Sequence, residues 1–238
     1  MEKVRQSNIE LLRILSMLML TIFHFNDHSL TCGPIWDDGI ANGFWWHMVQ
    51  TLTITGTNIF VLITAYFGIH FKLRSVFRLY LMCFIWGIIG YLLYCLVMGV
   101  PVGFALFGRV FAFTHNKWWF IITYLELYFL SPVLNAAIEK MDKRSHMYSI
   151  LAFSFPTIYL GYCHFMGEDT WGTSLSHFVY LYLIGQYIHK YISIQQIHLW
   201  KNKWLCGFLL TSILIFAEAL LRCAGLHLQW LEPYPYCN

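Results

Sequence analysis

Two side chains near the start of the chain combine acid–base and anion-binding chemistry. His24 is a residue type that titrates near neutral pH and can accept a proton from a hydroxyl group, whereas Arg13 stays charged and can hold a phosphate or an oxyanion. The two residues lie eleven positions apart within an apolar run. On an α-helix this spacing differs from three full turns by roughly 20° and corresponds to about 16 Å of rise. The sequence therefore predicts both side chains on one face of a helix.

Other polar residues share this face of the predicted helix. Ser16 and Asp27 lie close to the same stripe. Lipid accommodates such groups poorly, so we expect the stripe to face a protein interior or a wet cavity. A simpler interpretation stays open: Arg13 can reach the headgroups or pair with Glu10, and His24 can be an interfacial polar residue.

The composition predicts an all-α, polytopic integral membrane protein. The chain is 58% hydrophobic and 11% charged, with a mean hydropathy of +0.57, whereas soluble domains carry about 25% charged residues. The polar, aromatic stretch 26–50 is expected to be a loop. We expect a single transmembrane domain over residues 1–238 with about seven spans, at residues 9–26, 51–70, 79–98, 118–138, 147–165, 175–191 and 204–221.

The positive charges predict the orientation of these spans. With the N-terminus in the cytoplasm, the outer segments hold Arg109, Lys117 and Arg222. The inner segments then hold eleven basic residues, namely Lys3, Arg5, Lys72, Arg74, Arg78, Lys140, Lys143, Arg144, Lys190, Lys201 and Lys203. Cytoplasmic loops of membrane proteins carry such an excess of Lys and Arg, so we expect a cytoplasmic N-terminus. The net charge of +3 is spread over short loops, and no nucleic-acid partner is expected.

Three residues in the other predicted spans could line a site. Asn58, in the second span, is either an interhelical hydrogen-bonding residue or a cavity-lining group. Glu126 lies near the middle of the fourth span, where a carboxylate is costly unless it is neutral or paired, and Arg13 is one candidate partner. Trp119 suits the aromatic belt at a membrane interface.

The motifs of several enzyme classes are missing from the sequence. There is no phosphate-binding loop, dinucleotide fingerprint, zinc-protease motif or nucleophile elbow. His24 and His28 have the spacing of metal ligands on a helix, with Asp27 between them. A metal ion there would need further ligands from elsewhere, and we predict no metal site.

Four stretches resemble the acyltransferase 3 family, bacterial membrane enzymes that O-acylate sugars. Their order and spacing agree over most of the chain. In this sequence they are Arg13–His24 (the Arg-x10-His motif of the family), Gly56–Ile69 (its second span), Asn116–Asn135 (its W-F…Y-L…P-L span) and Phe178–Ile188 (its Y-F-x-x-G-Y span). Thr64 and Ala65 stand where the family commonly has a Ser-Gly pair, so the role of that pair is open here.

The resemblance implies a function and a set of roles. It implies transfer of an acyl group, acetyl by default, from cytoplasmic acyl-CoA to a hydroxyl of a cell-surface or exported carbohydrate, with no permanently bound cofactor. The protein would be a multi-pass protein of the bacterial inner membrane. His24 would be the general base and Arg13 would hold the donor. Candidates for binding the CoA phosphates are Lys72, Arg74 and Arg78, which also suit any cytoplasmic turn, and candidates for positioning substrate are Asn58, Trp119 and Glu126.

Two other functions stay open on the sequence alone. The chain could be a transporter or flippase of a glycan or lipid, with Arg13, Glu126 and His24 along its path, although no paired halves are seen. Family members usually have more spans and a longer chain, so the resemblance also implies a C-terminal truncation. An inactive remnant of the family is the second alternative.

Overall fold

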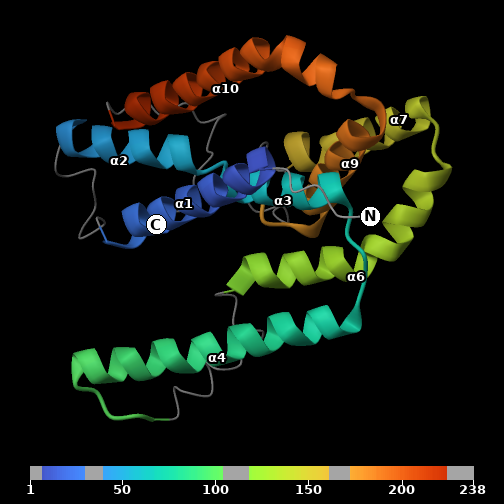
Figure 1. Cartoon of the computed structure of the whole chain (residues 1–238). Coiled ribbons are helices and arrows are strands. Elements are labelled where there is room, and N and C mark those ends of the chain that lie inside the picture. Colours follow the sequence, from blue (N-terminus) through green and yellow to red (C-terminus); the bar gives the residue numbers. More distant parts are fainter. Residues whose placement is uncertain (1–6, 30–39, 104–117, 161–171, 224–238) are drawn as a thin grey trace.

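The computed structural model describes residues 7–29, 40–103, 118–160 and 172–223. These residues are helical apart from short connections, and no strand occurs among them. Figure 1 shows the arrangement. The elements in chain order are α1 (Ser7–Ser29), α2 (Ile40–Thr53), α3 (Gly56–Phe67), α4 (Leu73–Met98), α6 (Trp119–Lys140), α7 (Lys143–Ser154), the π-helix η2 (Phe155–Leu160), α9 (Leu175–Tyr191) and α10 (Ile194–Cys223).

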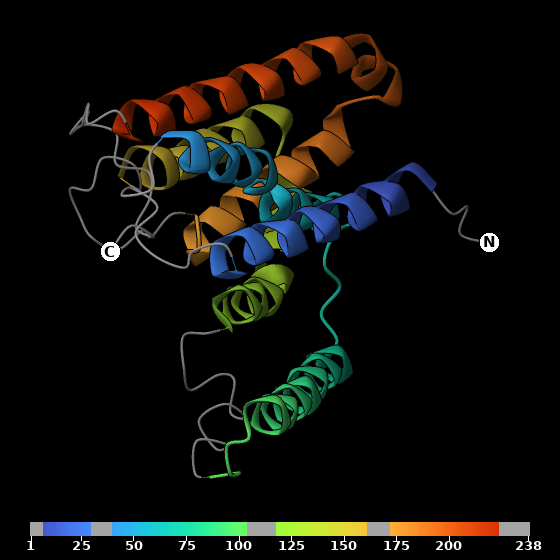
Figure 2. The ribbon, with the colours of Figure 1, turned by 90° about the vertical axis from the view of Figure 1, so that its left-hand side faces the viewer.

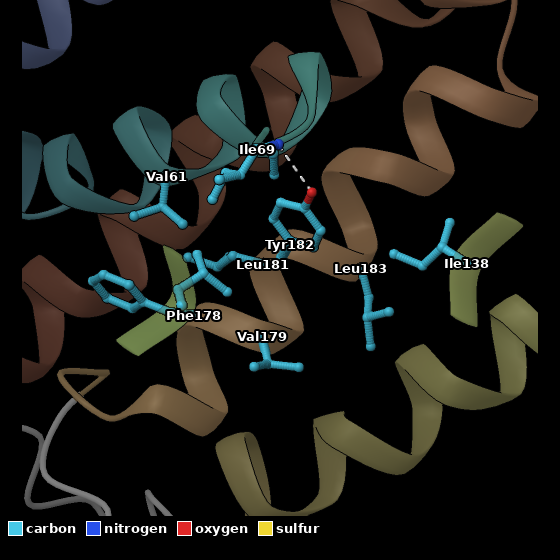
Figure 3. Close-up of a cluster of buried hydrophobic side chains, with 10 residues drawn as sticks. Val61, Ile69, Ile138, Phe178, Val179, Leu181, Tyr182 and Leu183 are labelled. Atoms are coloured by element: carbon cyan, nitrogen blue, oxygen red, sulfur yellow. Dashed lines mark hydrogen bonds between the residues drawn. The ribbon is translucent and has the colours of Figure 1, made fainter. Parts of the chain in front are cut away.

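Helix α9 lies at the centre of the core. It packs against α3, α6 and α7, and Phe178, Val179 and Leu181–Leu183 are buried along it. Figure 3 shows these side chains meeting Val61 of α3 and Ile138 of α6. Burial of this helix from several sides explains why its apolar residues do not follow a single stripe.

A small residue allows α3 and α9 to approach closely. A Cβ atom placed on Gly185 of α9 would lie 3.0 Å from the backbone nitrogen of Tyr66 and would overlap the Cβ of Ala65. Ala65 is fully buried. Small residues at such crossings are typical of helix packing in membranes. Ala65, one of the two departures from the family pattern, is therefore a packing residue.

Four segments among the described residues are long and apolar enough to cross a membrane. They are Asn8–Asn26, Trp45–Phe67, Leu73–Met98 and Trp119–Lys140. Large apolar side chains such as Leu96, Val97 and Trp204 face outward, which suits a lipid environment. Figures 1 and 2 show α4 set apart from the helices around α9. The described chain is an all-helical membrane protein.

The predicted loop over residues 26–50 is wrong, because α2 occupies Ile40–Thr53. Hydrogen bonds join polar groups of α1 and α2. The Nε1–H of Trp46 donates to the backbone oxygen of Asn26 (3.1 Å), and the Asn26 amide donates to Oε1 of Gln50 (3.1 Å). These partners are distant in sequence, so local composition does not predict them.

The other predicted spans correspond to helices whose boundaries mostly differ, but those at 147–165, 175–191 and 204–221 are not among the four candidate membrane spans of the described residues. The span at 51–70 starts earlier, at Trp45, and ends at Phe67, because the next five residues are not helical. The helix at 79–98 begins at Leu73, and the helix at 204–221 begins at Ile194. For the span at 147–165, the described part comprises α7 from Lys143 and η2 to Leu160. The span at 175–191 has the bounds of α9.

Prolines inside α6 and η2 have local structural consequences. Pro132 has no N–H to donate to the carbonyl of Tyr128, one turn earlier. The hydroxyl of Ser131 donates to that oxygen instead, at 2.7 Å, so α6 continues to Lys140. Pro156 lies in the π-helical turn Phe155–Leu160, where the same missing donor accompanies the change from α-helical hydrogen bonding.

Candidate functional site

Arg13 extends from α1 towards the C-terminal end of α3. Its guanidinium lies 5.3 Å from the ring centre of Phe67, the last residue of α3. Its Nη1 is 3.2 Å from Oε1 of Glu10, and both side chains are about two-fifths exposed. The simpler expectation that Arg13 pairs with Glu10 is thus confirmed, but the half-exposed guanidinium still presents donors to a ligand.

The face of α1 that carries Arg13 packs partly against α3. Ser16 is fully buried, and a Cβ on Gly56 would lie 3.0 Å from the Ser16 backbone oxygen and 3.2 Å from the Leu20 nitrogen. The helices therefore cross at the N-terminal end of α3. The expectation of a buried stripe is correct at Ser16.

His24 lies on the same face beyond this crossing and is exposed. It follows Leu20 by one turn, so it stands about 6 Å further along α1. Its ring contacts that of Phe23 edge-on, with 5.6 Å between the centres. Helix α2 packs on the side of Asn26, which is about 160° from His24 around the axis. His24 therefore projects past α3 and away from α2. The side chains of Asp27 and His28 lie outside the described residues.

Asn58 forms a polar cluster with residues that the sequence analysis did not select. Its Oδ1 is 3.1 Å from Nε2 of His177 in α9. The first turn of α9 is held by Ser174, whose hydroxyl accepts the His177 backbone N–H at 3.2 Å. The Thr123 hydroxyl of α6 donates to the backbone oxygen of Thr173 at 2.9 Å. These two separate hydrogen bonds, Asn58–His177 and Thr123–Thr173, join α3 and α6 to the start of α9, and we call Asn58, Thr123 and His177 the polar cluster.

An aromatic series on α6 runs from the polar cluster to the opposite end of the bundle. Trp119, a predicted substrate-positioning residue, is half-buried against the core next to Phe120. Phe120, Tyr124 and Tyr128 follow at successive turns, with ring centres 6.0 and 6.4 Å apart. Glu126 lies on α6 and is exposed, and no ion pair joins it to Arg13 among the described residues.

The opposite end carries the basic residues. Residues 68–72, which we call the strap, run from α3 to α4 without helical structure, and Lys72 has an extended backbone. Lys72 ends the strap, whereas Arg74 and Arg78 lie in the first turns of α4, and all three are exposed. Arg74 also lines an open depression of about 620 Å³, together with Leu73, Val76, Phe77, Tyr80 of α4 and Leu125 of α6.

Side chains of α6 and α9 hold the strap by its backbone. The Tyr182 hydroxyl accepts the N–H of Ile69 at 3.0 Å and donates to Oδ1 of Asn135 at 2.6 Å. The Asn135 amide donates to the Ile69 oxygen at 2.8 Å. The Tyr128 hydroxyl accepts the N–H of Lys72 at 2.9 Å and donates to the backbone oxygen of His70 at 3.0 Å.

The structure thus groups the predicted residues at two ends. Arg13 and the basic residues lie at the strap end, whereas Asn58 and Trp119 lie towards the polar cluster. The sequence analysis missed His177, Tyr182 and Asn135, which are far in sequence from their partners. Their one local signal is a polar group within an apolar helix, such as Tyr182 and Gln186 one turn apart on α9.

Comparison with known proteins gives one result. The family model described as an acyltransferase domain, that of acyltransferase 3, matches residues 6–238. No curated protein and no solved structure matches the chain.

Proposed function

Because the chain belongs to the acyltransferase 3 family, we propose that it is an O-acyltransferase that moves an acyl group, acetyl by default, from acyl-CoA to a hydroxyl of a cell-surface or exported carbohydrate. The family match covers nearly the whole chain and supports an acyltransferase. The donor, the acceptor and the acetyl group are our proposal. It rests on one structural observation, the separation of cationic and polar groups between the two ends of one helical bundle.

The strap end suits a donor with phosphate groups. Arg13, Lys72 and Arg74 present exposed or half-exposed cations there, and guanidinium groups bind phosphate through paired donors. The apolar depression beside Arg74 offers a surface for the uncharged part of the donor. Arg78 adds a further cation one turn along α4.

The other end suits a carbohydrate hydroxyl. Asn58 and His177 supply amide and imidazole groups, and Trp119 supplies an aromatic surface, all of which are common partners of sugars. Exposed His24 would remove the proton of the acceptor hydroxyl while its oxygen attacks the thioester carbonyl carbon. The carbon–sulfur bond then breaks, and CoA leaves as the thiolate and takes up a proton. The rise of about 16 Å from Arg13 to His24 is within reach of the extended pantetheine arm.

The proposed topology follows from the charges. We place the N-terminus and the strap end in the cytoplasm, with seven spans in the inner membrane, because the strap and the start of α4 belong to the basic inner segments. This orientation brings the donor site to the side where acyl-CoA is made. His24 and the polar cluster then face the outer side.

The test is acyl transfer in cells that lack their own glycan O-acetylation. The wild-type chain, His24→Ala and the control Thr21→Ala, an exposed neighbour on α1, are expressed at matched membrane levels. Alkali-labile acetyl on surface polysaccharide is then quantified. We expect acetyl with the wild type and Thr21→Ala and a loss of at least about a hundredfold with His24→Ala. Equal acetylation by His24→Ala would remove His24 from the mechanism, and proton flux without acetyl transfer would favour a transporter.

A further inference from the structure

The strap is a non-helical segment in an otherwise helical membrane protein. A non-helical segment lacks the internal hydrogen bonds of a helix, so its backbone groups need partners from elsewhere. Gly68 begins it with φ +74°, a conformation that L side chains rarely adopt, and its N–H donates to the oxygen of Ala65 (3.0 Å). The chain therefore leaves α3 at a defined residue and in a defined direction.

The partners of the strap form two closed hydrogen-bond rings. In the first, Ile69 uses both its N–H and its oxygen, through Tyr182 and Asn135, which also bond to each other; Figure 3 shows the bond from Ile69 to Tyr182. In the second, the Tyr128 hydroxyl bridges the N–H of Lys72 and the oxygen of His70. Four backbone groups within four residues are thus fixed by three side chains.

These side chains are themselves held rigidly. Tyr182 is fully buried in the centre of α9, and Tyr128 lies between the rings of Tyr124 and Phe71, at 6.4 and 5.4 Å. Tyr128 and Asn135 are seven residues apart on α6, so they lie on the same face. Packed side chains of α6 and α9 therefore hold the backbone of the strap, although the strap is part of neither helix.

We propose that Tyr128, Asn135 and Tyr182 are positioning residues for the acyl donor, an inference that rests on the proposed function. They hold the strap so that Lys72 and Arg74 occupy fixed places at the start of α4, where Arg74 lines the depression. Helix α4 stands apart from the bundle (Figure 1), so the strap is the connection that sets where its first turn begins. Groups that are fixed before binding lose less conformational entropy when a ligand binds.

The experiment uses the full chain in nanodiscs of phosphatidylethanolamine and phosphatidylglycerol. The variants are Tyr182→Phe and Tyr128→Phe, which remove single hydroxyls, with Tyr148→Phe, an exposed tyrosine of α7, as the control. Three quantities are measured: the rate of trypsin cleavage after Lys72 and Arg74, the Kd for coenzyme A by calorimetry, and the KM and kcat for acetyl-CoA.

We expect the two strap variants to be cut faster and to bind coenzyme A about three- to tenfold more weakly, which is the loss that one or two hydrogen bonds allow. The KM for acetyl-CoA should rise by a similar factor with kcat unchanged, because the hydroxyls do not touch reacting atoms. Tyr148→Phe should match the wild type. A general folding defect would instead lower kcat and yield together.

The opposite results separate the two proposals. If cleavage is unchanged, the hydroxyls do not hold the strap, and if cleavage rises but Kd and KM stay the same, the strap does not position the donor. Either result overturns this inference and leaves the proposed function intact. If the wild type neither binds coenzyme A nor transfers acetyl, the proposed donor is wrong, and the positioning role is wrong with it.

Discussion

Gly185→Ala should destabilise the protein by separating α3 from α9. The added Cβ would lie 3.0 Å from the Tyr66 nitrogen and 3.1 Å from the Ala65 carbonyl carbon, and it would overlap the Ala65 Cβ. Two of these atoms are backbone, so relief requires movement of a helix and not a change of rotamer. Overpacking of this kind costs about 1–3 kcal/mol. The better helix propensity of alanine offsets up to about 1 kcal/mol of that cost.

The assay is reversible unfolding of the purified chain in mixed micelles, followed by circular dichroism. Gly90→Ala is the matched control, since no atom lies within 4 Å of its added Cβ, and its stability should stay the same or rise slightly. Adding Ala65→Gly to Gly185→Ala removes the side-chain overlap but leaves the backbone contacts, so it should restore only part of the loss. A Gly185→Ala protein as stable as the wild type would refute the close crossing.

Two further predictions concern α6 and α7. Ser131→Ala should lower the free energy of unfolding by about 1 kcal/mol, because it removes the donor to the Tyr128 oxygen beside Pro132; the same unfolding assay would contradict this if stability were unchanged. At the start of α7, Ser145 hydrogen-bonds to Asp142 and lowers the pKa of that carboxyl. This interaction therefore stabilises the protein above the unfolded-state pKa of Asp142 and is lost as pH falls through its lower folded-state pKa. Asp142→Asn should thus weaken the loss of stability in acid, measured by thermal unfolding between pH 2 and 6, and an unchanged pH profile would exclude that contribution.

Local sequence predicts the helices that carry long apolar runs. It predicts α9 with correct bounds, and it places Arg13 and His24 on one helical face. Local sequence does not predict a segment whose conformation depends on hydrogen-bond partners far away in the chain. The predicted span at 51–70 includes the first three residues of the strap, Gly68–His70, because they continue the apolar run of α3. The hydroxyls that hold the strap come from Tyr128 and Tyr182, tens of residues away.

The candidate site shows the same division between local and distant information. The chemistry of the basic residues and of Asn58 is visible in their types, but the contact of Asn58 with His177 joins residues 119 positions apart. His24 is exposed, whereas α2 packs on the Asn26 side of α1. No periodicity within α1 contains that information, because a helical stripe predicts which side chains share a face and not what covers it.

The non-helical strap explains how one chain can present cations from two separated helices at the same end. A helical continuation of α3 would advance about 1.5 Å per residue, whereas an extended segment covers about 3.3 Å per residue. Five non-helical residues therefore reach α4, which lies away from the bundle. Because the hydroxyls of Tyr182 and Tyr128 bind the strap at Ile69, His70 and Lys72, we expect the first turn of α4 to keep its place despite this reach. The position of Lys72 and Arg74 at the start of α4 therefore has a structural cause that is independent of their own charges.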